Sequence, residues 1–208
     1  MNVEAVTVDA YGTLVTLIDP VQSLRTALAR QGVERDADTV ARAFGAEVEY
    51  YVARSHEGRD EATLAVLRRA CAAIFLASAD ADLDAAAFTP AFVGALSFRP
   101  VDGAEEACRR LADAGLKLAV VSNWDVGLHE QLRELELDSL VDAVVTSAEA
   151  GAPKPMRAIF DLALRRLDAD ASRAVHVGDG AADAEGARAA GMRFEPAPLR
   201  DAAARILA

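Results

Sequence analysis

Residues 3–14 of the chain read Val-Glu-Ala-Val-Thr-Val-Asp-Ala-Tyr-Gly-Thr-Leu. The run from Val3 to Val8 is mostly apolar and β-branched, which is typical of a buried strand, and Gly12 and Thr13 then indicate a tight turn. Asp9 lies where this strand ends. In open α/β sheets ligands bind just beyond the carboxyl ends of the strands, so Asp9 stands where a nucleophile is expected.

The bulk composition excludes several classes of partner. The chain has 208 residues and a formal net charge of −11, which argues against a surface for nucleic acid or anionic membranes. An anionic small-molecule substrate must therefore be captured locally. No apolar stretch approaches the ~20 residues of a membrane span, and no secretory signal precedes the first strand, so the expected location is the cytoplasm. The sequence indicates no oligomeric state.

The order of the expected elements predicts an α/β fold. Residues 17–96 show helical periodicity without strand signals, with a weaker last helix that is predicted to break near Pro90. From Pro100 onward helices alternate with short apolar strands, which predicts a Rossmann-like parallel sheet in a three-layer α/β/α core. The first strand belongs to that sheet. We therefore expect a core domain of residues 1–15 and 97–208 and an inserted all-helical cap domain of residues 16–96.

Polar residues follow the later strands of the expected sheet. Because the carboxyl ends of parallel strands meet at one edge, these residues should converge with Asp9. Each of them alone could be a turn former, a helix cap or a solvated lysine, but such a succession of groups on one sheet is unexpected from turn chemistry alone. They are Ser122-Asn123, Lys154-Pro155, Gly178-Asp179 and Asp183.

Together these motifs resemble those of the haloacid dehalogenase superfamily, and the helical block resembles the cap of that family. The resemblance covers essentially the whole chain. It implies a hydrolase with Asp9 as nucleophile, Ser122 and Lys154 as ligands of the transferred group and Asp179 as a magnesium ligand, with Asp183 supporting the metal site.

Charge balance independently favours a bound cation. If Asp9, Asp179 and Asp183 are all ionised at one edge, three negative charges face the single positive charge of Lys154. A hard divalent ion with oxygen ligands fits this arrangement, and Mg²⁺ is the cofactor we predict. The backbone carbonyl of Tyr11 could also bind it.

Tyr11 separates the candidate reactions. In phosphatases of the resembled family the residue two after the nucleophile is usually an aspartate that protonates the leaving group, and a phenol is a poor substitute near neutral pH. A 2-haloacid dehalogenase needs no such proton, and its first motif also reads Asp-Ala-Tyr-Gly-Thr. The motif Gly178-Asp179-Gly180, however, resembles the metal-binding type and favours a phosphatase. We therefore predict a Mg²⁺-dependent phosphatase of a small phosphorylated metabolite, with a metal-independent dehalogenase as the alternative.

Several further residues complete the expectations. A third possibility is a phosphometabolite-binding or regulatory protein with little turnover. Tyr11, Asn123 and Trp124 are candidate substrate contacts at the rim, although packing accounts equally well for Trp124. His176 lies inside a strand and is expected to be structural. Cys71 and Cys108 lack metal-ligand spacing and are expected to be reduced packing residues.

Overall fold

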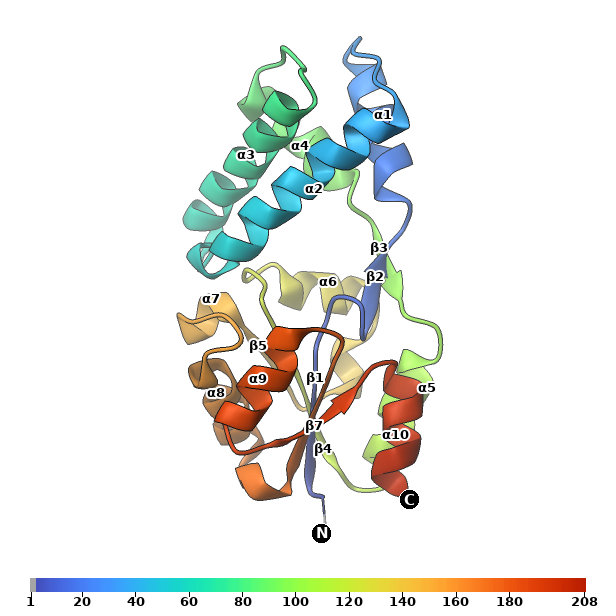
Figure 1. Cartoon of the computed structure of the whole chain (residues 1–208), viewed down its shortest axis with the longest axis vertical. Helices are drawn as coiled ribbons and strands as arrows, with labels where there is room; N and C mark the ends of the chain where they lie inside the picture. The colour runs from blue at the N-terminus through green and yellow to red at the C-terminus, as the bar shows by residue number, and fades with distance from the viewer. Residues whose placement is uncertain (1–2) are drawn as a thin grey trace. The chain divides into compact units, whose positions relative to one another are not determined.

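A computed structural model describes residues 3–208, so residues 1 and 2 of the expected core domain lie outside the described range. The chain divides into two compact units. One consists of the residues up to 16 together with 99–208, and the other of residues 17–98. The first unit contains a five-stranded sheet, and the second is built from helices (Figure 1).

The sheet of the first unit is entirely parallel. Its strands are β1 (Ala5–Val8), β4 (Lys117–Ser122), β5 (Ala143–Thr146), β6 (Ala174–Gly178) and β7 (Arg193–Pro196). They lie in the order β5-β4-β1-β6-β7, so β1 is central. Strands β1 and β6 are buried along their whole length, as expected for parallel strands that are covered on both faces.

The register brings three strand ends together. Val8 of β1 is level with Val120 of β4 on one side and with Val177 of β6 on the other. The chain therefore leaves the sheet at Asp9, Ser122 and Asp179 along one edge. This convergence follows from the central position of β1, since its two neighbours are the strands that lead to Ser122-Asn123 and to Gly178-Asp179.

Helices cover both faces of the sheet (Figure 1). Helices α8 and α9 pack together against one face, and α5 and α10 pack together against the other. The helices of this unit are α5 (Ala104–Asp113), α6 (Leu128–Glu134), α7 (Ser147–Ala150), α8 (Arg157–Leu167), α9 (Ala181–Ala189) and α10 (Leu199–Leu207). Short 3₁₀ helices are Asp138–Leu140 and Ala171–Arg173. The prediction of an α/β fold with a parallel central sheet is confirmed.

Four helices form the second unit, and an aspartate caps each of them. The helices are α1 (Pro20–Arg30), α2 (Ala37–Arg54), α3 (Glu61–Ser78) and α4 (Ala85–Gly94), with a 3₁₀ turn at Ser55–Glu57. In each case the carboxylate of the preceding aspartate accepts a hydrogen bond from a backbone N–H in the first turn. Such caps are worth about 1 kcal/mol each, so these aspartates fix where the helices begin.

Helix α4 continues past Pro90, so the predicted break near Pro90 is wrong. Aromatic packing stabilises the helix on both sides of the proline. Phe88 and Phe92 are both buried and both pack against Phe75 of α3, with ring centroids 6.3 and 5.4 Å away. Burying two phenylalanine side chains on one helical face outweighs the backbone hydrogen bond that the proline cannot make.

The sequence patterns did not predict two short strands and two helices. Strands β2 (Val15–Leu17) and β3 (Phe98–Pro100) pair with each other, although no strand was predicted there. Three-residue strands are too short to show an alternating pattern. Helices α7 and α10 were also not predicted. Cys71 and Cys108 are free and buried, as expected. Within residues 3–208 no helix is long and apolar enough to cross a bilayer.

Candidate active site

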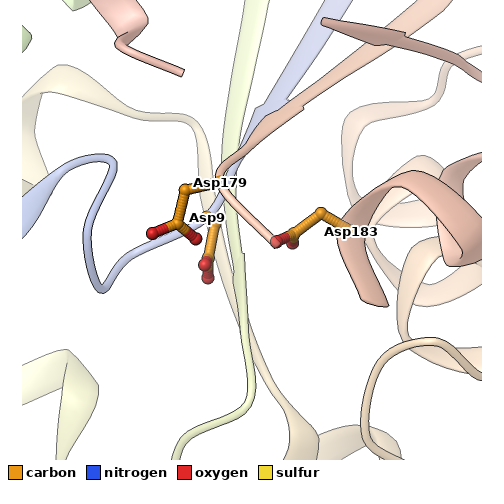
Figure 2. A group of neighbouring side chains, drawn as sticks. All are labelled: Asp9, Asp179 and Asp183. Atoms are coloured by element: carbon orange, nitrogen blue, oxygen red, sulfur yellow. The ribbon is translucent and has the colours of Figure 1, made fainter. Parts of the chain in front are cut away.

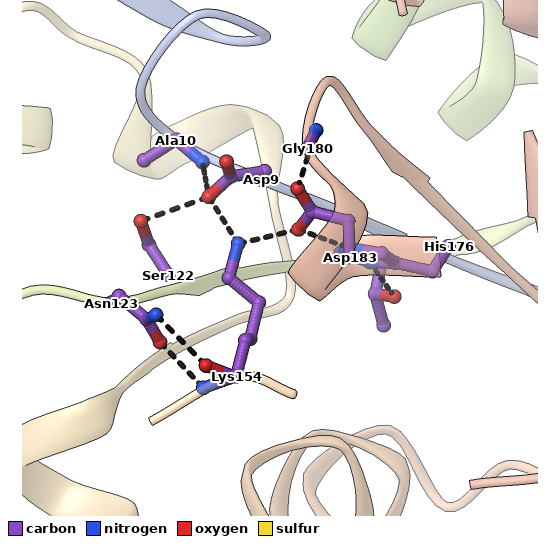
Figure 3. A network of polar contacts seen from close by, with 9 residues as sticks. Asp9, Ala10, Ser122, Asn123, Lys154, His176, Gly180 and Asp183 are labelled. Atoms are coloured by element: carbon purple, nitrogen blue, oxygen red, sulfur yellow. Dashed lines mark hydrogen bonds and ion pairs between the residues drawn. The ribbon is translucent and has the colours of Figure 1, made fainter. Parts of the chain in front are cut away.

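Asp9 is buried at the end of β1, and its carboxylate is held through one oxygen. Oδ1 accepts hydrogen bonds from Ala10 N at 2.7 Å and from Ser122 Oγ at 2.9 Å. The ammonium group of Lys154 lies 2.6 Å from the same oxygen. Figure 3 shows these contacts converging from separate segments. Because these three contacts all involve Oδ1, Oδ2 is the oxygen that can face a substrate.

The turn after Asp9 depends on Gly12. The carbonyl of Ala10 accepts hydrogen bonds from Leu14 and Val15, and Gly12 adopts a φ of 82°. A side chain at Gly12 would be strained by this φ, and its Cβ would lie only 2.2 Å from Oδ2 of Asp179. Gly12 therefore lets the carboxylates from β1 and β6 approach each other.

Lys154 is buried between two carboxylates. Its Nζ atom lies 2.6 Å from Oδ1 of Asp9 and 2.6 Å from Oδ1 of Asp183. Burial alone would lower the pKa of the ammonium group, but the charges of the two aspartates outweigh it and raise that pKa above its ordinary value. Lys154 is therefore fixed as a cation beside Asp9.

Asn123 fastens the backbone of Lys154 to the end of β4. Its Oδ1 accepts a hydrogen bond from Lys154 N at 2.6 Å, and its Nδ2 donates to Lys154 O at 3.2 Å (Figure 3). Both polar atoms of the side chain are thus engaged within the protein. The predicted contact of Asn123 with substrate stays a prediction. The structure shows that this residue joins the loop after β4 to the segment that carries Lys154.

Asp183, in the first turn of α9, is buried and receives donors from three sides. Oδ1 contacts Lys154 Nζ and His176 Nε2 at 2.6 and 2.9 Å, and Oδ2 accepts from Gly180 N at 3.0 Å. Burial alone would raise the pKa of Asp183, but the His176 hydrogen bond and the Lys154 charge hold it well below its usual range. Gly178 makes room for this carboxylate, since a Cβ there would lie 2.4 Å from Cγ of Asp183.

Asp179 completes a group of three carboxylates (Figure 2). One carboxylate oxygen from each of Asp9, Asp179 and Asp183 lies within 4.8 Å of the other two. Asp179 is exposed as a residue, but partial desolvation of its carboxyl group and the charges of Asp9 and Asp183 raise its pKa. Three hard oxygen donors around one point, with mutual repulsion between them, fit a divalent cation such as Mg²⁺.

The two aromatic candidates differ in how they are held. Tyr11 is 48% exposed and stands on the turn next to Asp9. The hydrogen bonds of this turn end on the carbonyls of Ala10 and Val15 rather than on that of Tyr11. Trp124 is half-buried, and its backbone carbonyl accepts a hydrogen bond from Ser147 Oγ at 3.0 Å. The backbone of Trp124 therefore ties the loop after β4 to α7.

Sequence reasoning assigned no contact to His176 or Thr7, yet both belong to this network. Thr7 and His176 are register partners on β1 and β6, and Thr7 Oγ1 lies 2.8 Å from His176 Nδ1. A signal was present in the sequence. Each residue precedes the strand-end aspartate of its own strand by two or three positions, so polar side chains there can meet behind the site.

The comparisons with known proteins agree with this geometry. A family model described as haloacid dehalogenase-like hydrolase matches residues 3–191. The haloacid dehalogenase-like hydrolase domain-containing protein 3 of Mus musculus is 39% identical over 52% of this chain and 47% of its own length. A ribulose-1,5-bisphosphate 5-phosphatase of Halopiger xanaduensis is 37% identical over 56% of this chain and 50% of its own length. The chain thus spans about half the length of these two relatives.

A dehalogenase and a solved structure also match. An (S)-2-haloacid dehalogenase of Pseudomonas putida is 26% identical over 89% of this chain and 80% of its own length. The crystal structure of a HAD-hydrolase from Bacillus subtilis bound to magnesium has a TM-score of 0.74 and 19% identity. It covers 93% of this chain, and the chain covers 88% of it, so the two share a fold.

Proposed function

The chain belongs to the haloacid dehalogenase-like hydrolase family, and from that premise we propose that it is a Mg²⁺-dependent phosphatase of a small phosphorylated metabolite. The observation that carries the proposal is the cluster of Asp9, Asp179 and Asp183 within 4.8 Å. Three carboxylates face the one ammonium group of Lys154, and a phosphate ester would add further negative charge. Such a site needs a divalent cation before it can accept an anion. A relative named as a sugar-bisphosphate phosphatase supports the same class of substrate.

Asp9 would act as the nucleophile through Oδ2. Its Oδ1 is occupied by Ala10 N, Ser122 Oγ and Lys154 Nζ, which hold the carboxylate in one orientation. Oδ2 forms a bond to phosphorus while the bond from phosphorus to the leaving oxygen breaks, which gives an aspartyl phosphate and an oxyanion that takes up a proton from water. Water then attacks the phosphorus and releases inorganic phosphate, which restores the carboxylate.

The cationic and hydroxyl groups would stabilise the transferred group. Lys154 and Ser122 both contact Asp9, so their donors would lie close to a phosphoryl group on this carboxylate. Asp9, Asp179 and the Tyr11 carbonyl would hold Mg²⁺, with Asp183 in support. When bound, the ion supplies positive charge that offsets the repulsion between the carboxylates and the phosphate.

Tyr11 shapes the expected substrate range. A phenol is a weaker acid than a carboxyl group and a poor base near neutral pH, and lost acid/base catalysis typically costs 10²–10⁴-fold in rate. Activity should therefore favour aryl and acyl phosphates over sugar or alcohol phosphates. The change Tyr11→Asp should raise the rate on alkyl phosphates, whereas Tyr11→Phe should not. Equal rates across the substrate series would count against this assignment.

Tyr11 also favours a second candidate, a 2-haloacid dehalogenase. There Oδ2 of Asp9 would attack the halogen-bearing carbon, halide would leave without a proton, and water would hydrolyse the ester. The dehalogenase from Pseudomonas putida matches most of the chain. The carboxylate cluster counts against a dehalogenase, because the substrate carboxylate would meet Asp179 and Asp183 where, among residues 3–208, Lys154 is the cation paired with this cluster.

One assay panel separates the two reactions. The full chain is incubated with phosphate esters, acetyl phosphate and 2-chloropropionate, each with Mg²⁺ and with excess chelator. Phosphate release that depends on Mg²⁺ is expected, and Asp9→Asn should abolish it. Halide release that continues in the presence of chelator would replace the phosphatase proposal by the dehalogenase. Binding of phosphorylated metabolites without turnover of any of these substrates would instead indicate a binding protein.

A further inference from the structure

His176 lies in the middle of β6 and is completely buried, yet both of its ring nitrogens have polar partners. Nδ1 lies 2.8 Å from Thr7 Oγ1, and Nε2 lies 2.9 Å from Asp183 Oδ1. Asp183 Oδ1 also contacts Lys154 Nζ, which in turn contacts Asp9. A continuous chain of polar contacts therefore runs from β1 through β6 and α9 back to the candidate nucleophile (Figure 3).

The chemistry of the partners fixes the direction of each hydrogen bond. Ionised Asp183 can only accept, so Nε2 of His176 must carry a hydrogen that it donates to Oδ1. Nδ1 of the neutral ring then carries no hydrogen and accepts from the Thr7 hydroxyl, 2.8 Å away. Thr7 and His176 are level in the parallel pair of β1 and β6, so the sheet register holds the ring in this tautomer.

Packing leaves the ring little freedom to turn. The ring of Phe160 meets His176 edge to face, with centroids 5.0 Å apart and an interplanar angle of 88°. Phe160 can occupy this place because residue 186 is glycine, since a Cβ at Gly186 would lie 2.3 Å from the Phe160 ring. Packing and the two polar partners therefore hold the ring in one orientation.

We propose that His176 is a positioning residue of the reaction, which acts through Asp183 to hold the Lys154 ammonium group against Asp9. A lysine side chain is long and flexible, so a fixed ammonium position requires a fixed counter-ion. Asp183 receives donors from His176, Lys154 and Gly180, and of these only His176 belongs to the interior of the sheet. The inference deepens the proposed phosphatase function, on which its activity measurement rests.

Two amide substitutions test the role of Nε2. In His176→Gln the side-chain amide reaches the position of Nε2 and can still donate to Asp183. In His176→Asn the amide ends at the position of Nδ1 and can reach only Thr7. With Mg²⁺ and p-nitrophenyl phosphate, His176→Asn should lose about 10- to 100-fold in kcat, as is common when a supporting hydrogen bond is removed. KM should change little, and His176→Gln should retain most of the activity. Equal kcat values for the two variants would overturn the proposal.

A spectroscopic measurement on the wild-type protein needs neither turnover nor a variant that folds. A long-range ¹H–¹⁵N correlation spectrum of ¹⁵N-labelled protein should show a pyrrole-type Nε2 and a pyridine-type Nδ1 for His176. The opposite tautomer would refute the hydrogen bond from Nε2 to Asp183 and the proposal with it. Absence of phosphatase activity together with the expected tautomer would overturn the proposed function and the reaction role, while the hydrogen-bond assignment would stand.

Discussion

Glu47 of α2 makes the stability of this protein depend on pH. The side chain is 4% exposed, and burial raises its pKa from an ordinary 4.5 to about 7, against a smaller opposing effect of a hydrogen bond with Cys71. The folded protein therefore binds this proton more tightly than the unfolded chain. Between pH 4.5 and 7 the folded state holds more protons than the unfolded chain. The contribution of protonated Glu47 to the free energy of unfolding is therefore fully present below pH 4.5 and is lost as the pH rises through 7.

The size of the effect follows from the shift. A difference of roughly 2.5 pKa units, at 1.36 kcal/mol each, corresponds to about 3 kcal/mol. Glu47→Gln keeps the shape of the side chain and removes the ionisation. At pH 5 the variant should be more stable than the wild type by only about 1 kcal/mol. At pH 8 it should be more stable by about 3 kcal/mol, which for a chain of this size is about 6–12 °C in Tm.

The assay compares melting temperatures by circular dichroism at pH 5 and pH 8. Glu49→Gln is the matched control because Glu49 is exposed on the same helix. Other carboxyl groups change the stability of wild type and variants alike, so only the difference between them is interpreted. If the gap in Tm between Glu47→Gln and the wild type is the same at both pH values, Glu47 does not titrate as a buried carboxyl and the reasoning fails.

Three further substitutions test the supports of the site. Gly12→Ala should abolish Mg²⁺-dependent turnover because its Cβ would lie 2.2 Å from Asp179, whereas Gly32→Ala, with a similar positive φ and open space, should cost only about 1–2 kcal/mol of stability and leave turnover intact. Loss of turnover in both variants would mean that general destabilisation is the cause. Asn123→Ala should lower the free energy of unfolding in urea by about 1–3 kcal/mol, because the Lys154 backbone loses two partners. Asn123→Asp keeps the acceptor for Lys154 N and should lose less stability. Equal losses in the two variants would contradict the idea that Asn123 holds the Lys154 backbone. Gly186→Ala should destabilise the fold by about 1–3 kcal/mol through a clash with Phe160, while Gly45→Ala on exposed α2 should stabilise it by about 0.5–1 kcal/mol. Both are measured by thermal melting, and a neutral Gly186→Ala would show that the Phe160 ring can move aside.

Sequence patterns were sufficient for the local parts of this fold. Asp19 before Pro20 marked the start of α1, and the apolar run before Asp9 marked β1, because capping and strand burial are properties of a few consecutive residues. The same local rules failed at Pro90. There the deciding contact is with Phe75 on another helix, and no short window of sequence contains it.

The candidate site divides in the same way. The sequence indicated which polar groups lie at or after the strand ends, because each has a readable position relative to a predicted strand. They are Asp9, Ser122, Lys154, Asp179 and Asp183. The contacts that join them are between segments far apart in the sequence. Asn123 holds Lys154 from 31 residues away, and Thr7 meets His176 across 169 residues. The first contact exists because β4 lies beside β5 and the second because β1 lies beside β6, and this strand order depends on packing over the whole chain rather than on any one segment.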